Sequence, residues 1–204
     1  MAKIKLTKNE LKKQKDALKM YQRYLPTLML KKQQLQAEIR TTELRIRELR
    51  QEKDVIDESF KTWIGVFGEK GVFSPDILRI TAVKTAEGNI AGVSIPLFQG
   101  AEFAVAAYDL VRTPLWLDTA VERLKQVLLL DLEARTLEEQ RRRLDHELRV
   151  TTQRVNLFEK IKIPETRENI KKIQVYLGDQ QTAAVVRGKI AKRGMERNPQ
   201  GAAE

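Results

Sequence analysis

Residues 35–49 read LQAEIRTTELRIREL, a stretch in which a stripe of side chains recurs at alternating steps of four and three residues. The stripe continues in the same register from Leu11 to Trp63, and twelve of its sixteen positions are apolar. A repeat of 3.5 residues faces one partner helix throughout only when the two helices wind into a left-handed coiled coil. A single helix over these residues would be about 80 Å long. The register runs unbroken past Pro26, so we expect this proline to kink the helix without ending it.

A second amphipathic helix is predicted in the C-terminal half. Thr113 is a favourable N-cap, and Pro114 suits the first helical position. The stripe of this helix is expected to pass through Arg141, to be interrupted at Pro164 and to resume as far as Ala184. The side chains predicted to form the seam between the two helices are Leu18, Leu25, Leu35, Ile39, Ile46, Leu49, Ile56, Leu137, Leu144, Leu148, Val155 and Phe158.

Between the two helices the sequence changes to a pattern typical of strands. Two runs rich in β-branched residues, near 77–85 and 90–98, flank residues 86–89. This arrangement predicts a β-hairpin with a four-residue loop. Pro96 restricts the second strand to the edge of a sheet, because proline cannot donate to a ladder.

The predicted fold is mainly α: a long antiparallel two-helix left-handed coiled coil with a small central β-hairpin cap. The hairpin reverses the chain, so the two helices bury their stripes against each other and the chain ends meet far from the cap. The predicted parts are an N-terminal coiled-coil helix (1–63), a cap with the hairpin (64–112), a C-terminal coiled-coil helix (113–197) and a disordered tail (198–204).

Composition excludes several kinds of site. The 204 residues include no Cys and one His, so a disulfide framework, a thiolate nucleophile and a multi-His metal site are excluded. The one histidine, His146, lies among charged residues of the second predicted helix and is expected at the solvated surface. Most carboxylates lie between Lys and Arg at helical spacing, as in i,i+4 pairs. We expect no catalytic residue and no cofactor.

The net charge of +10 is concentrated at the two ends of the sequence. Residues 1–32 carry 10 basic and 2 acidic side chains, and residues 187–197 carry 5 and 1. In an antiparallel pair of helices these two segments would form one basic tip. Clustered Lys and Arg also bind phosphates, so a nucleic-acid surface is an alternative interpretation of the tip. The basic side chains of the predicted tip are Lys3, Lys5, Lys8, Lys12, Lys13, Lys15, Arg187, Lys189, Lys192 and Arg193.

Hydropathy gives no sign of membrane insertion. No stretch approaches the roughly 18–20 consecutive apolar residues that a membrane-spanning helix needs. Residues 1–5 lack the apolar core of a secretory signal. We therefore expect a cytoplasmic protein that does not insert directly into a membrane.

Several motifs resemble the D subunit of the V/A-type rotary ATPases. Residues 154–159 read RVNLFE and are followed by Ile163-Pro164, where that family has Arg-Val-Asn-Ala-Leu-Glu and then Ile-Pro. Residues 89–96, NIAGVSIP, resemble the family's mid-chain strand. The resemblance spans nearly the whole chain, from Thr7 to about Arg193. The positions that match the C-terminal motif are Arg154, Val155, Asn156, Glu159 and Pro164.

The resemblance implies a non-catalytic central rotor shaft that couples ATP hydrolysis or synthesis to proton or sodium translocation. It implies that the chain ends reach into a ring of nucleotide-binding catalytic and non-catalytic subunits, which the basic tip contacts. The cap end would meet the small F subunit of the stalk and a connector to the membrane rotor ring. The protein would then be peripheral to the membrane and bind no nucleic acid. Torque would be a population shift, since the axle binds open and closed catalytic sites with different affinity.

Two alternatives from other classes stay open at the level of the sequence. One is a non-catalytic coiled-coil scaffold or chaperone-like protein, with the basic tip as a surface for nucleic acid. The other is the γ shaft of the F-type synthase. That shaft carries between its helices an α/β domain larger than the cap predicted over 64–112.

Overall fold

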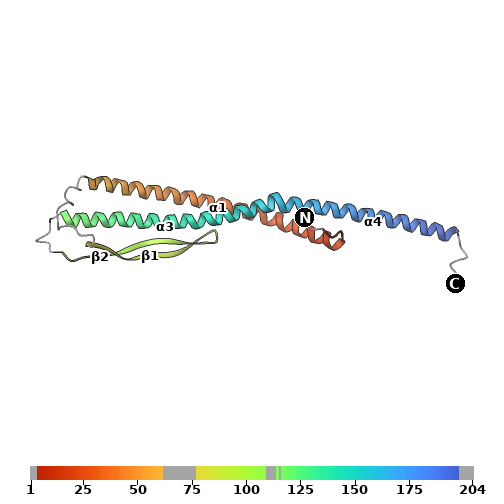
Figure 1. Ribbon diagram of the computed structural model, residues 1–204, viewed down its shortest axis with the longest axis horizontal. Helices are drawn as coiled ribbons and strands as arrows, with labels where there is room; N and C mark the ends of the chain where they lie inside the picture. The colour runs from red at the N-terminus through yellow and green to blue at the C-terminus, as the bar shows by residue number, and fades with distance from the viewer. Residues whose placement is uncertain (1–3, 62–76, 109–113, 115, 198–204) are drawn as a thin grey trace. The chain divides into compact units, whose positions relative to one another are not determined.

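The computed structural model describes residues 4–61, 77–108, 114 and 116–197. The fold is mainly α with one two-stranded antiparallel hairpin, which confirms the predicted fold class, while the hand of the supercoil stays a prediction. Along the chain the elements are α1 (Lys8–Lys61), β1 (Leu78–Ile90), β2 (Val93–Val105), α3 (Trp116–Asn156), the π-helical turn η2 (Leu157–Lys162) and α4 (Ile163–Arg197) (Figure 1). The predictions made for Lys3, Trp63, residues 64–76 of the cap, Thr113 and the tail 198–204 fall outside the described residues.

The chain packs as two compact units. The hairpin unit comprises Lys31–Thr151, and the terminal unit comprises Met1–Leu30 together with Thr152–Glu204. Helix α1 contributes to both units. It continues through Pro26, so the proline does not end the helix, as predicted.

In the hairpin unit the stripe of α1 is buried with the heptad spacing. Burying a leucine or isoleucine side chain contributes about 1.5–3 kcal/mol relative to leaving it exposed. The unit is therefore held together chiefly by this seam. The buried residues of α1 are Leu35, Ile39, Thr42, Ile46 and Leu49, and those of α3 in the same unit are Leu117, Ala120, Val121, Ala134, Gln140, Leu144 and Thr151.

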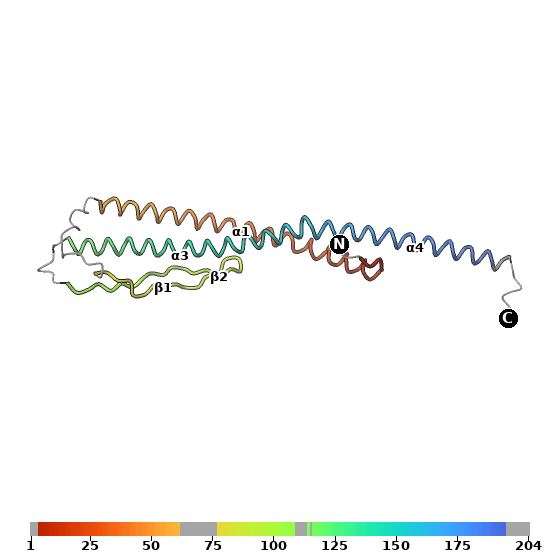
Figure 2. Tube along the Cα trace, viewed as in Figure 1, coloured from red at the N-terminus to blue at the C-terminus, as the bar shows by residue number. Residues whose placement is uncertain are grey.

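Ion pairs show that α1 and α3 run antiparallel within this unit. Lys31 Nζ lies 2.6 Å from Glu147 Oε1. Further along, Lys53 Nζ lies 3.3 Å from Asp131 Oδ1, so rising numbers on α1 meet falling numbers on α3 (Figure 2). Lys53 occupies a seam position, and a polar pair there fixes the register of the two helices. Three further pairs join the same helices: Arg45 with Glu133, Arg50 with Glu138 and Arg141 with Glu43.

The hairpin lies along the helix pair instead of capping its end. Strands β1 and β2 run beside α3 in Figures 1 and 2. Apolar clusters join hairpin and helices both near the turn and near the open end of the hairpin. The sequence predicts the hairpin as a cap at the end of the helix pair, whereas in the structure it lies along α3. The clusters consist of Leu35, Ile39, Ile95 and Leu144 near the turn, and of Ile77, Leu117 and Val121 near the open end.

The turn of the hairpin is not at the position predicted from the sequence. The strands meet at Ile90 and Val93, so the loop has two residues, Ala91 and Gly92, and the predicted loop over 86–89 belongs to β1. Ala91 has φ 50° and Gly92 has φ 80°, which are the left-handed values that a type I′ turn requires. Asn89 Oδ1 accepts a hydrogen bond of 3.0 Å from the backbone N–H of Gly92.

Replacing Ala91 with asparagine is expected to stabilise the protein by about 0.5–1 kcal/mol, because asparagine tolerates the left-handed conformation better than alanine. The variant Ala91→Asn creates an Asn-Gly turn, and urea unfolding followed by circular dichroism would measure the gain. Ala104→Asn is the matched control, at an exposed position inside β2 where asparagine is disfavoured. Equal changes in both variants would contradict the assigned turn.

In the terminal unit, α1 packs against η2 and α4. The rings of Tyr21 and Phe158 stack in a tilted arrangement with centroids 5.0 Å apart. The preceding stretch of the chain, at Leu6, lies beside Lys171 and Val175 of α4, so the pairing is again antiparallel. The buried residues on this side are Val155, Ile163, Thr166, Asn169 and Ile173.

The π-helical turn η2 shifts the phase of the seam. The backbone N–H of Ile163 donates to the carbonyl of Phe158, five residues earlier. This wider turn takes up one residue more than an α-helical turn. Buried Val155 and Ile163 are accordingly eight residues apart, where the heptad predicts seven. Pro164 therefore neither breaks nor ends the helical rod, because the missing proline N–H falls where the helix has already widened.

Two residues expected in the second stripe are not in it. Arg141 is exposed, and its neighbour Gln140 is buried instead. The Gln140 side chain donates to the carbonyl of Pro96 on β2, so this position faces the hairpin as well as the helix seam. Ala184 is also exposed, because no described residue packs against that part of α4.

Candidate protein-interaction site

Charged and apolar groups dominate the described surface. Across residues 4–61, 77–108, 114 and 116–197, no three His, Asp or Glu side chains are grouped to hold a metal ion. His146 is an exposed residue of α3, as expected.

The N-terminal basic side chains lie on α1 and immediately before it. Lys5, Lys8, Lys12, Lys13 and Lys15 are all exposed. Leu6, in the same stretch, lines a shallow depression with Glu168, Lys171, Lys172 and Val175 of α4. The N-terminal basic group therefore lies beside residues 168–175 of α4.

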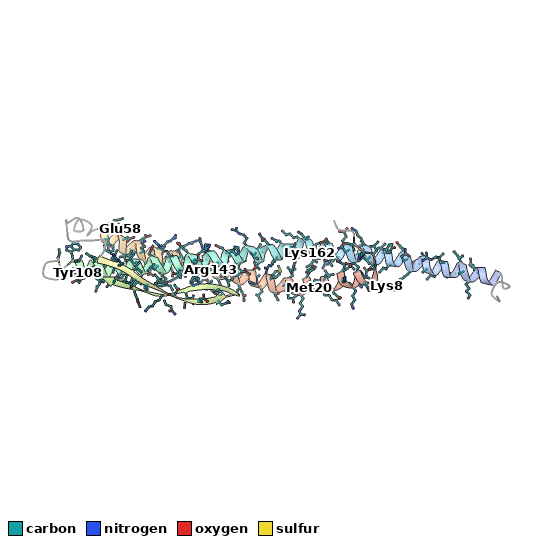
Figure 3. The ribbon with its side chains drawn as sticks, turned by 60° about the horizontal axis from the view of Figure 1, so that its bottom comes forward. Lys8, Met20, Glu58, Tyr108, Arg143 and Lys162 are labelled. Atoms are coloured by element: carbon teal, nitrogen blue, oxygen red, sulfur yellow. The ribbon has the colours of Figure 1, made fainter. Side chains whose placement is uncertain are left out.

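The C-terminal basic side chains lie further along α4. Arg187, Lys189, Lys192 and Arg193 are exposed. At 1.5 Å per residue, Arg187 lies about 18 Å beyond Val175 and Arg193 about 27 Å beyond it. Figure 3 shows Lys8 beside the middle of α4, which continues well past it. The two basic groups therefore do not form the single tip predicted from the sequence.

The separation follows from the unequal lengths of the two paired segments in the terminal unit. In this unit α1 begins at Lys8 and continues to Leu30, whereas η2 and α4 run from Leu157 to Arg197. Because the two segments pair antiparallel, the surplus at the end of α4 extends past the start of α1 (Figure 3). This surplus could have been found in the sequence by comparing the lengths of the two predicted helices.

The surplus, which we call the α4 arm (residues 178–194), carries uncovered apolar side chains. Every residue of the arm is exposed except Ala183, which is half-buried. Val186 and Ile190 are 49% and 64% exposed, and their spacing of four places them on one face of the helix. Isolated helices of this length are marginal in water, and contiguous apolar surface marks interaction sites. The α4 arm thus has the character of a helix that pairs with another protein.

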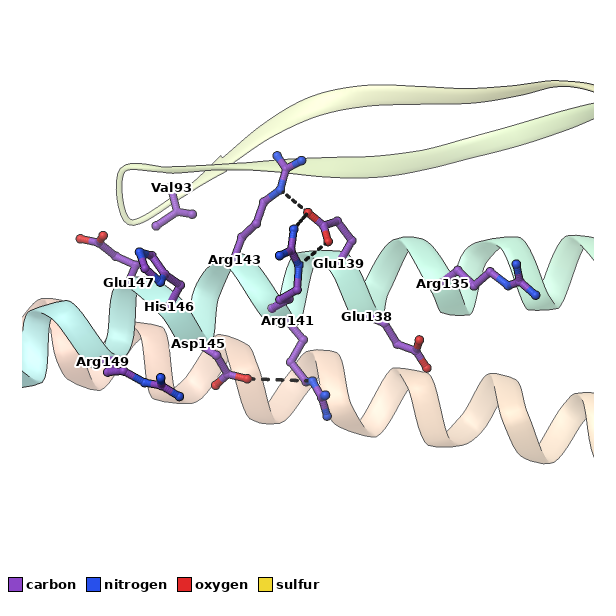
Figure 4. A pocket seen from close by; sticks show the side chains of 11 residues that line it. Val93, Arg135, Glu138, Glu139, Arg141, Arg143, Asp145, His146, Glu147 and Arg149 are labelled. Atoms are coloured by element: carbon purple, nitrogen blue, oxygen red, sulfur yellow. Dashed lines mark hydrogen bonds and ion pairs between the residues drawn. The ribbon is translucent and has the colours of Figure 1, made fainter.

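A second charged region lies on α3 beside the hairpin. Glu139 accepts hydrogen bonds from Arg142 Nε at 2.7 Å and from Arg143 Nε at 2.9 Å. These hydrogen bonds, drawn as dashed lines in Figure 4, lower the pKa of Glu139 to about 2. Arg143 also donates, through Nη1, to the carbonyl of Ser94 at 3.2 Å. This hydrogen bond and the one from Gln140 to the Pro96 carbonyl attach β2 to α3.

The residues of the C-terminal motif surround the π-helical turn. Arg154 and Asn156 are exposed at the end of α3, while Val155 is buried between them. Glu159 lies within η2 and Pro164 directly after Ile163, and both are exposed. The motif therefore marks an irregular turn of the helix. Counting heptads does not place this turn, because a strict repeat puts Lys162, seven residues after Val155, in the stripe where the structure buries Ile163.

Comparison with known proteins gives a consistent result. The family model of the ATP synthase D subunit matches residues 10–193. The D subunit of the V-type ATP synthase from Borreliella burgdorferi is 54% identical over 197 residues, with 96% of each chain covered. Proteins of the same name from Chlamydia pneumoniae and Chlamydia muridarum are 35% and 36% identical. The alignments cover 95% of this chain and 93% of the first protein, and 96% of this chain and 97% of the second.

Proposed function

The chain belongs to the family of ATP synthase D subunits, and from this premise we propose that it is the axle of a V-type rotary ATPase. It is a non-catalytic stalk component of that complex. The nucleotide-binding residues then belong to other subunits, and this chain transmits their conformational changes. The family relation favours this function over the scaffold or nucleic-acid-binding alternative.

The observation that carries the proposal is the α4 arm. Its apolar face, with Val186 and Ile190, has no partner within the described chain. The basic side chains Arg187 and Lys189 flank that face. A partner that surrounds the arm with apolar contacts and acidic side chains would cover both. The ring of nucleotide-binding catalytic and non-catalytic subunits is the partner that we propose.

Coupling requires differential binding and no chemistry by the axle. The α4 arm presents different side chains in different directions around its axis. Each member of a surrounding ring therefore meets a different surface at each rotary position. A site that binds the axle better in its closed conformation is shifted toward closure, and the effect is reciprocal. The arm thus suits transmission of torque.

The remaining partners link the axle to the membrane. No helix within the described ranges is long and apolar enough to span a bilayer. Attachment would therefore run through the small F subunit of the stalk and the connector to the membrane rotor ring. The protein would lie in the cytoplasmic sector, peripheral to the membrane. Whether that ring moves protons or sodium ions is a property of the partners.

Reconstitution tests the proposal. A complex assembled without this chain is expected to hydrolyse ATP without moving ions, and addition of the full chain is expected to restore ATP-driven ion uptake into vesicles. Uptake is measured with a pH-sensitive dye or with a sodium-sensitive dye. Equal ion uptake with and without the chain would contradict an axle function.

A further inference from the structure

An open groove with a volume of about 1040 Å³ lies in the hairpin unit, between the outer face of α3 and the turn of the hairpin. Val93 lines it from β2, and the side chains of α3 from Arg135 to Arg149 line the remainder (Figure 4). Arg142, His146 and Arg149 follow one another at steps of four and three, so they lie on one face of the helix. All three residues are exposed.

The carboxylates of the groove already have cationic partners. Glu139 binds Arg142 and Arg143 together. The others are paired as follows: Glu138 with Arg50, Asp145 with Arg141 at 4.0 Å, and Glu147 with Lys31 at 2.6 Å. Two of these cations, Arg50 and Lys31, come from α1, outside the groove lining.

The pairing leaves an excess of positive charge on the groove. Arg142 and Arg143 share one carboxylate, and the Arg142 side chain remains 76% exposed. Arg149 forms no ion pair with any residue that the structure describes. Charged surfaces steer and select partners of opposite charge, and guanidinium groups bind carboxylates in a bidentate manner. The groove therefore matches an acidic partner.

Its size and composition restrict the partner further. The distance along α3 from Arg142 to Arg149 is about 10 Å, two turns of helix. A partner helix with carboxylates at matching steps of three and four would place them opposite both arginines. No Phe, Tyr or Trp is among the described residues that line the groove, so it lacks large rings for base stacking, and a duplex would need a longer track of positive charge.

We propose that this groove, named the α3 groove for its residues Arg142, His146, Arg149 and Val93, binds an acidic helical segment of another protein. This surface is separate from the α4 arm, so it goes beyond the axle function. We assign the segment to a further component of the assembled ATPase, and that assignment rests on the proposed function.

Zero-length cross-linking tests the proposal in the intact complex. Arg142→Lys/Arg149→Lys keeps both charges and introduces amines that carbodiimide couples to carboxylates in direct contact. We expect an intermolecular cross-link from these positions to Asp or Glu of a partner helix, identified by mass spectrometry. The matched control is Arg40→Lys/Arg47→Lys, an exposed pair seven residues apart on α1 in the same unit, with no expected cross-link.

Charge reversal measures the contribution of the groove to binding. Arg142→Glu/Arg149→Glu is expected to weaken retention of the cross-linked partner at least ten-fold, measured by native mass spectrometry at low salt. Arg40→Glu/Arg47→Glu is expected to retain it. Thermal unfolding of the free chain checks that both variants fold, and both should, because the four arginines are exposed.

The results separate this inference from the axle proposal. A complex that assembles and pumps ions, yet gives no intermolecular cross-link from the α3 groove, overturns the inference alone. Equal cross-linking or equal loss of the partner in the α1 controls also overturns it. A third result would also overturn it: the wild-type chain binds duplex DNA and the Arg142→Glu/Arg149→Glu variant does not. Nucleic acid would then be the partner of the groove. Failure of the complex to assemble or pump with the wild-type chain contradicts the axle proposal instead.

Discussion

Replacing Leu144 with alanine is expected to lower the free energy of unfolding by about 3–5 kcal/mol. Leu144 is fully buried, in one cluster with Leu35 and Ile39 of α1 and Ile95 of β2. The truncated side chain would leave a cavity where three elements meet, and none of them can close it without moving the other two. Urea unfolding followed at 222 nm, at fixed protein concentration, measures the loss.

Leu44→Ala provides the control for this prediction. Leu44 is a leucine within α1 of the same unit, but it is 57% exposed. Both substitutions make the same chemical change in a helix, so the difference between them reports burial alone. We expect Leu44→Ala to change stability by less than about 0.5 kcal/mol. Similar losses for the two variants would show that Leu144 is not packed between the helices and the hairpin.

Val186→Asp/Ile190→Asp is expected to weaken binding of the chain to the nucleotide-binding ring by a factor of about 100 or more. Each of these side chains is worth about 1.5–3 kcal/mol if a partner buries it fully, and aspartate would bring charge into that contact. Folding of the free chain should change little, because both side chains are already exposed. Surface-immobilised chain titrated with the purified ring measures the affinity.

The matched control introduces two aspartates at exposed apolar positions of α1. Leu44 and Val55 lie on α1, and Val55 is 71% exposed. Leu44→Asp/Val55→Asp therefore introduces two charges at exposed apolar positions away from the α4 arm, and it is expected to bind the ring with unchanged affinity. If Val186→Asp/Ile190→Asp binds the ring with the affinity of the wild-type chain, the α4 arm is not the contact. This conclusion does not depend on the control.

The pairing of the helices could be predicted because the seam follows a simple period. Burial at Leu35, Ile39, Thr42, Ile46 and Leu49 has the steps of four and three that the sequence shows. A repeat of this kind needs no knowledge of the partner, only the geometry of a helix.

The position predicted for the hairpin turn is wrong because glycine occurs both in turns and inside strands, where it makes room for a neighbouring side chain. Gly88 suggested a loop, yet it lies within β1, where a Cβ would come within 2.8 Å of Leu97 Cδ1. The glycine is there to let Leu97 pack across the strand. The true turn contains Ala91 at positive φ, a residue that gives no turn signal in the sequence.

The basic residues were all identified in the sequence, but their arrangement was not. The predicted single tip required arms of equal length, which would bring Lys8 and Arg193 to the same level. The offset between them depends on where the pairing begins, and in the structure Leu6 lies at the level of Lys171 and Val175. Only the three-dimensional structure supplies that level.

The π-helical turn also has a consequence for how this chain tolerates changes of length. Between buried Val155 and Ile163 it already absorbs one residue in excess of the repeat. Loss of a single residue from Leu157–Lys162 would allow an ordinary helix in which Val155 and Ile163 are seven residues apart, so the residues downstream would keep the face that they turn to α1. Gain of a single residue would instead rotate everything downstream by about 100° relative to α1. Single-residue deletions at this point should therefore be tolerated better than single-residue insertions.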